Sequence, residues 1–166
     1  MADWLQWGIT TIIGIIALLG GRFWGKHDRK TDHDKKILDE LLKIMPGDRT
    51  IQFIREKDFR GSFFLDQLDD LDDLFIQKNR KEFMFIDKEL EKKRQKLVEI
   101  SDEFNVFLAK SSFPKDFQGR RMNQIPQENE FKNPEKYHAT IHKVHQLADE
   151  VCKIYDDLVI SATKKV

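Results

Sequence analysis

The longest apolar stretch of the chain lies at its start. Between Asp3 and Arg22 there is no acidic or basic side chain. In a helix that rises about 1.5 Å per residue, about 20 such residues cross the roughly 30 Å of hydrocarbon in a bilayer. Trp4 and Trp7 stand at one end and Trp24 at the other, where tryptophan favours the membrane interface. We therefore predict a single transmembrane helix, residues 1–24, that anchors the protein in membrane lipid.

The distribution of basic residues predicts how this anchor is oriented. None precedes the apolar stretch, whereas Arg22 and Lys26 begin a basic run after it. Basic flanks of a span stay in the cytoplasm, so we expect a signal-anchor in the cell membrane with the N-terminus outside and residues 25–166 cytoplasmic. The opposite topology would make the protein a periplasmic coiled-coil spacer. A cleaved signal peptide fits less well, because only Asp3 stands where a basic region is expected.

After a charged linker over residues 25–36, apolar residues recur at helical spacing over 37–45, and Pro46 and Gly47 end that pattern. Thr50 to Ile54 alternates and is rich in β-forming residues, which predicts one short strand. Leucines separated by aspartates predict a helix over 63–75. A longer helix is predicted over 81–112, where an apolar stripe is missing one turn that Lys93 or Arg94 occupies.

The most regular pattern of the chain lies over residues 134–163. Steps of three and four residues connect its apolar positions, which are Ile141, Val144, Ala148, Val151, Tyr155, Leu158 and Ala162. Such a narrow stripe is typical of helices packed as in a coiled coil. We predict an all-α domain over 37–166, in which this helix and the 81–112 helix form an antiparallel hairpin or small bundle. Self-association through the same stripes is the alternative.

Residues 113–134 interrupt the helical pattern. Pro114, Pro126 and Gly119 predict an irregular loop of about twenty residues, which is unusually long for a compact domain. Apolar side chains are expected to hold this loop against the helix ends, and they are Phe113, Phe117, Met122, Ile125 and Phe131.

Composition excludes several classes of function. The 29 basic and 29 acidic residues cancel, which gives no reason to expect nucleic-acid binding. Cys152 is the only cysteine, so an intramolecular disulfide and a cysteine-based zinc site are excluded. Nucleotide-binding glycine loops and serine-nucleophile motifs are absent. The aspartate pairs of residues 69–73 match a magnesium-binding pattern of prenyl-transferring enzymes, but the chain is too short for their cavity. We interpret them as a solvated acidic face.

Two sets of residues are candidates for binding. His138, His142, His145 and Asp149 share one stripe of the last predicted helix, where histidines four residues apart can chelate a metal ion. We interpret them as a polar flank of the bundle and predict no cofactor, with a metal site as the alternative. The second set is an exposed patch for a partner, and its candidates are Phe59, Phe63, Phe64, Arg120 and Arg121.

Together these patterns predict a membrane-anchored, non-enzymatic interaction or scaffold protein. Its cytoplasmic helical domain would oligomerise with itself or bind another membrane or cytoplasmic protein. The alternative is a membrane-tethered effector or enzyme with an unrecognised site on the 134–163 helix.

Overall fold

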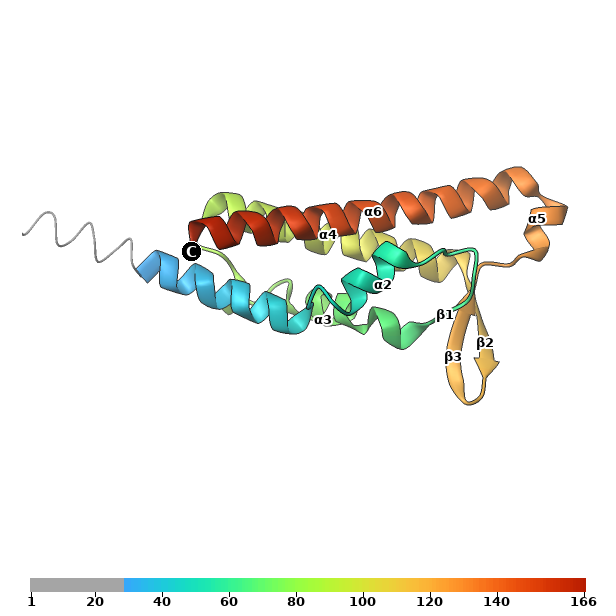
Figure 1. Ribbon diagram of the computed structural model, residues 1–166, viewed down its shortest axis with the longest axis horizontal. Helices are drawn as coiled ribbons and strands as arrows, with labels where there is room; N and C mark the ends of the chain where they lie inside the picture. The colour runs from blue at the N-terminus through green and yellow to red at the C-terminus, as the bar shows by residue number, and fades with distance from the viewer. Residues whose placement is uncertain (1–28) are drawn as a thin grey trace, which may run out of the picture.

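The computed structural model describes residues 29–166, which form an elongated helical bundle with a small sheet near one end (Figure 1). The predicted all-α class is therefore correct in that helices predominate, but it does not include the three-stranded sheet. The predicted membrane anchor and its flanking residues Trp4, Trp7, Arg22, Trp24 and Lys26 lie outside the described residues. Within residues 29–166, no helix combines the length and the apolar character that crossing a bilayer requires.

Two long helices run side by side along the molecule (Figure 1), α4 (Lys88–Ser111) and α6 (Pro134–Lys165). They are antiparallel, since Lys96 pairs with Glu150 at 3.8 Å and Glu103 pairs with Lys143 at 3.1 Å. Every apolar position of the predicted 134–163 stripe is buried. The helix itself is therefore confirmed, and its N-terminus is capped by the Asn133 side chain with Pro134 in the first turn.

The other long helix begins later than the sequence pattern predicts. Residues 81–83 form a 3-10 turn, η2 (Lys81–Phe83), and α4 begins only at Lys88. The reason is Asp87, whose carboxylate accepts hydrogen bonds from the backbone amides of Glu89 and Leu90 and so caps α4. Ile86, which the pattern included in the helical stripe, lies outside α4 and is 52% exposed.

The strand predicted at Thr50 to Ile54 is wrong, because these residues belong to a helix, α2 (Thr50–Glu56). Alternation over five residues also fits one helical face, since Ile51 and Ile54 lie three positions apart and are both buried. The backbone of α2 contacts α6 directly, as the Cys152 thiol donates to the Ile51 carbonyl at 3.7 Å. The helix before α2 covers residues 29–44.

The helix predicted over 63–75 is correct only in its second half. Phe63 and Phe64 form a short strand, β1 (Phe63–Phe64), followed by the 3-10 helix η1 (Leu65–Leu68) and by α3 (Asp69–Gln77). This strand forms by pairing with β3, a distant part of the chain, in which Asn123 lies opposite Phe63. Local periodicity carries no information about such a partner.

The irregular loop predicted over 113–134 is also wrong. It contains a hairpin of β2 (Phe113–Phe117) and β3 (Arg120–Gln124), followed by the helix α5 (Glu128–Lys132). Gln118 and Gly119 form the turn with positive φ angles of 51° and 78°, as two-residue hairpins require. Pro114 is tolerated because β2 is an edge strand of the β1-β3-β2 sheet.

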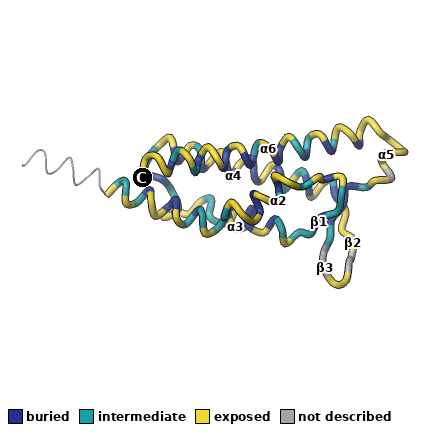
Figure 2. The backbone as a smooth tube through the Cα atoms, viewed as in Figure 1, coloured by how far each residue is buried: buried dark blue, intermediate teal, exposed yellow. Residues whose placement is uncertain are grey.

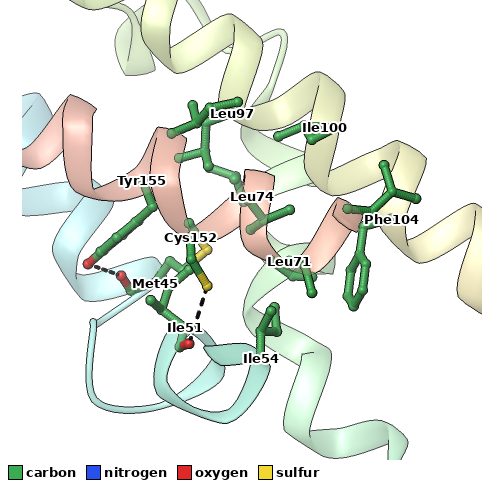
Figure 3. Close-up of a cluster of buried hydrophobic side chains, with 14 of the residues drawn as sticks. Met45, Ile51, Ile54, Leu71, Leu74, Leu97, Ile100, Phe104, Cys152 and Tyr155 are labelled. Carbon is green, nitrogen blue, oxygen red and sulfur yellow. Dashed lines mark hydrogen bonds between the residues drawn. The ribbon is translucent and has the colours of Figure 1, made fainter. Parts of the chain in front are cut away.

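The core lies between the long helices and the segments that cover them, where the buried positions face inward (Figure 2). Figure 3 shows part of it, with Leu97 and Phe104 from α4, Leu71 and Leu74 from α3, and Tyr155 from α6. The Tyr155 hydroxyl donates to the Met45 carbonyl at 2.9 Å. This bond attaches the end of the 29–44 helix to α6.

Candidate functional site

The two ends of the bundle differ in character, and each end is assembled from several elements. The C-terminus of α6 lies beside the beginning of the 29–44 helix, whereas α5 and the β2–β3 hairpin lie at the opposite end (Figure 1). We call the first end the base, defined by Lys30, Asp34, Asp87 and Lys165. We call the second end the tip, defined by the hairpin and α5.

Polar contacts hold the base together. Asp87, the cap of α4, pairs with Lys30 and with Lys165, each at 3.1 Å. Burial alone would raise the pKa of the Asp87 carboxyl, but hydrogen bonds from Lys165, the Leu90 and Glu89 amides and Lys30 together hold this pKa well below its ordinary value. The carboxylate of Asp34 accepts hydrogen bonds from the backbone amides of Ile86 at 2.6 Å and Asp87 at 3.0 Å. Three helix ends are therefore joined around two carboxylates.

The tip carries exposed aromatic side chains instead. Phe131 on α5 is 87% exposed and Phe113 at the start of β2 is 61% exposed. Both were predicted to pack against the helix ends, and for both this prediction is wrong, whereas Ile125 between them is buried as expected. Exposed aromatic rings that share one end of a molecule are typical of surfaces that another protein covers.

The residues predicted to form an exposed patch lie elsewhere. Phe59 and Phe63 are buried, and their rings meet edge to face at 5.7 Å. The patch prediction is therefore wrong for these two residues, which fill the core. Phe64 is half-buried in β1. Arg120 and Arg121 lie in β3, where they pair in register with Phe117 and Asp116.

The predicted histidine stripe does not converge on a common point. His145 is held at its Nε2 atom by the backbone amide of Phe59, at 3.1 Å, and lies 3.6 Å from Asp58. His138 packs against the Tyr137 ring, and both His138 and His142 are exposed, as is Asp149. Over residues 29–166, no three His, Cys, Asp or Glu side chains are grouped as a metal ion would need.

The aspartates of residues 69–73 were interpreted as a solvated acidic face, which is wrong for Asp70. Its buried carboxylate pairs with the Arg49 guanidinium, and this pairing raises the pKa of Arg49. Asp69 lies beside a cavity of about 480 Å³ that Arg49 and Asp73 also line. Burial and the neighbouring carboxylates raise the pKa of Asp69. The ion pair with Arg49 gives Asp70 a structural role.

A second cavity, of about 560 Å³, lies between α3, the segment after it and α4. We call it the Arg94 groove, and its lining residues are Phe75, Lys78, Asn79, Lys81, Met84, Arg94, Gln95, Val98, Glu99 and Asp102. One sequence feature indicates this site, namely the turn of the 81–112 apolar stripe that lacks an apolar residue. Arg94 occupies that turn and is 1% exposed.

Comparison of this chain with protein-family models, with curated proteins and with solved structures found no match in any of the three.

Proposed function

We propose that this protein is a membrane-anchored interaction protein without enzymatic activity. Residues 1–24 hold it in the cell membrane, the described helical bundle is cytoplasmic, and the tip recruits a partner protein or a second copy of the chain. The opposite placement of base and tip (Figure 1) supports this proposal. The 29–44 helix begins at the base and follows the proposed anchor in the sequence, so the tip faces away from the membrane.

The length of the bundle determines how far the tip lies from the membrane. Helix α6 contains 32 residues, which corresponds to about 48 Å at 1.5 Å per residue. A rod of this length presents its tip well beyond the lipid headgroups, which extend only a few ångströms from the hydrocarbon. The polar contacts of Asp34 and Asp87 at the base connect the 29–44 helix rigidly to the two long helices.

The single observation that carries the proposal is the exposure of Phe131. A phenylalanine that is 87% exposed leaves most of its ring in water, which is unfavourable by roughly 25 cal/mol per Å² of apolar surface. Aromatic side chains are enriched among the residues that dominate binding at protein interfaces. A partner that covers Phe131 and Phe113 would recover this free energy.

Site-specific photocrosslinking in native membranes tests the proposal directly. A benzophenone amino acid at position 131 of the full chain should give one discrete adduct, either with a second copy or with one partner. The matched control carries the same amino acid at position 160, because Ile160 on α6 is also apolar and 54% exposed but lies near the base. Equal adducts at both positions, or none at 131, would contradict an interaction surface at the tip.

The proposed topology needs a separate probe. Cys152 is buried and its thiol donates to the Ile51 carbonyl, so it will resist labelling on either side of the membrane. We expect Gln146→Cys, at an exposed position of α6, to react with a membrane-impermeant maleimide in lysate but not in intact cells. Labelling in intact cells would reverse the orientation and favour a periplasmic spacer.

A further inference from the structure

The Arg94 groove is independent of the tip and has the features of a small-molecule site. Two contacts of α4 show how the groove runs along this helix, one with α3 and one with Lys78, the residue that follows α3. Asn105 donates to Asp72 at 3.0 Å, and the Arg94 guanidinium reaches the Lys78 carbonyl at 3.4 Å. The groove therefore runs from Lys78 and Arg94 at one end toward Asp102 at the other.

Arg94 is an incompletely satisfied buried cation. Its Nε and Nη2 atoms donate to the Glu91 carboxylate at 2.9 and 2.7 Å, so the charge of the guanidinium is balanced. Its Nη1 atom is buried and has no hydrogen-bond partner anywhere in residues 29–166. Buried donors without a partner are rare in folded proteins and cost about 1–3 kcal/mol each. Arg94, one of the residues that line the groove, therefore carries a donor that lacks an acceptor.

The charges around the groove are divided between its two ends. Lys78 and Lys81 line the end that contains Arg94, whereas Glu99 and Asp102 lie one and two helical turns further along α4. The Lys78 ammonium also lies 3.6 Å above the Phe75 ring, which places a cation beside an apolar surface. An anion is therefore attracted to the Arg94 end and repelled from the other end. Because Glu91 already balances Arg94, the two lysines supply the net positive charge at this end.

The remaining lining combines the polar side chains of Asn79 and Gln95 with an apolar wall. Phe75, Met84 and Val98 contribute to the wall, and Phe75 belongs to the exposed hydrophobic residues. A volume of about 560 Å³ is within the range of small-ligand sites, in which an apolar wall is combined with a few polar groups that orient the ligand. We propose that the Arg94 groove binds a small organic carboxylate with an apolar body. Its carboxylate accepts from Arg94 and the two lysines, and its body contacts Phe75 and Val98.

Methyl NMR of the full chain in neutral detergent tests this site with defined probes. The chain has four methionines, of which Met84 lines the groove and Met45 is fully buried in the core. We expect 3-phenylpropionate to shift the Met84 methyl signal saturably in the millimolar range, as small ligands of this size bind. The Met45 signal should not move. Acetate lacks the apolar body and 3-phenylpropanol lacks the charge, so each should bind at least about tenfold more weakly.

Variants separate a specific site from general partitioning. Lys78→Glu combined with Lys81→Glu should weaken 3-phenylpropionate binding at least about tenfold. Lys92→Glu, on an exposed position of α4 outside the groove, should change it less than about twofold. Arg94→Lys should also weaken binding, with an unchanged Met45 signal as evidence that the core is intact.

Three results would overturn the proposal. The first is the absence of a saturable Met84 shift, which would mean that 3-phenylpropionate does not bind in the groove. The second is equal binding of 3-phenylpropionate and 3-phenylpropanol. The third is equal loss in the double lysine variant and in Lys92→Glu.

Discussion

A single arginine interrupts the apolar stripe of α4. Arg94 lies between Leu90 and Leu97, where the spacing of three and four residues predicts a buried apolar side chain. Its burial is possible because Glu91, one turn earlier, forms two hydrogen bonds with it and also accepts from the Phe85 amide at 3.0 Å. The Arg94 guanidinium lies 5.5 Å from the Phe83 ring. The pair is thus a buried ion pair within one helix.

We expect Arg94→Met to destabilise the protein by about 3–5 kcal/mol, because it leaves the Glu91 carboxylate buried without its cation. Arg94→Met combined with Glu91→Met should recover most of this loss, since both buried charges are then removed. Urea unfolding followed by circular dichroism measures both differences, with Lys92→Met as an exposed control. A single variant as stable as the control would show that the pair contributes nothing.

Individual elements were predictable to the extent that their own residues determine them. The stripe of α6 repeats from Ile141 to Ala162, so both its ends and its buried face could be predicted. The β2–β3 hairpin could not, because Pro114 disfavours a strand locally and only its edge position makes it acceptable. Sequence patterns also do not distinguish Phe59, which is buried, from Phe131, which is exposed. That difference depends on tertiary contacts, which also create the Arg94 groove.

The N-terminus of α4 gives a pH-dependent prediction. The pKa of Asp87 is lower in the folded protein than its ordinary value. Such a carboxylate stabilises the fold above its unfolded pKa of about 4, and this contribution is lost as the pH falls through the lower folded pKa. Asparagine caps helices as well as aspartate does, so Asp87→Asn removes the charge but keeps the cap.

We therefore expect Asp87→Asn to cost about 1 kcal/mol at pH 7, since Lys30 and Lys165 are partly exposed. Below about pH 4 the difference from the unmodified protein should shrink. Unfolding by urea at several pH values measures it, and Asp39→Asn at an exposed position of the 29–44 helix is the control. A difference that stays constant down to the most acidic pH would contradict the role of the Asp87 charge.

At the scale of the whole molecule, the contacts at the base determine how the bundle and its tip are oriented relative to the 29–44 helix. Asp34 binds two backbone amides that precede α4, Lys30 pairs with Asp87, and His33 Nε2 lies 3.0 Å from the Met84 carbonyl oxygen. Three residues of one helix therefore contact the segment that leads into α4. If the proposed anchor fixes the 29–44 helix at the membrane, these contacts orient the entire bundle.

Asp34→Ala should loosen this connection without unfolding the bundle. We expect a loss of about 1–3 kcal/mol, because the Ile86 and Asp87 amides lose their acceptor. Hydrogen exchange measured by mass spectrometry should become faster in residues 29–44 and 84–87 and should stay slow in α6. Asp32→Ala, at an exposed position of the same helix, serves as the control. Uniformly faster exchange throughout would mean that Asp34 supports global folding and not this connection.

The two-residue turn of the hairpin has a practical consequence. Gln118 and Gly119 are exposed, and a side chain added at Gly119 would meet no atom within 4 Å. A short epitope or a fluorescent protein inserted between them would extend outward from the end that carries Phe131. A fusion at Val166 would instead crowd Lys30 and Lys165 at the other end. The hairpin turn is therefore the attachment point from which a reporter can follow the far end of the bundle in living cells.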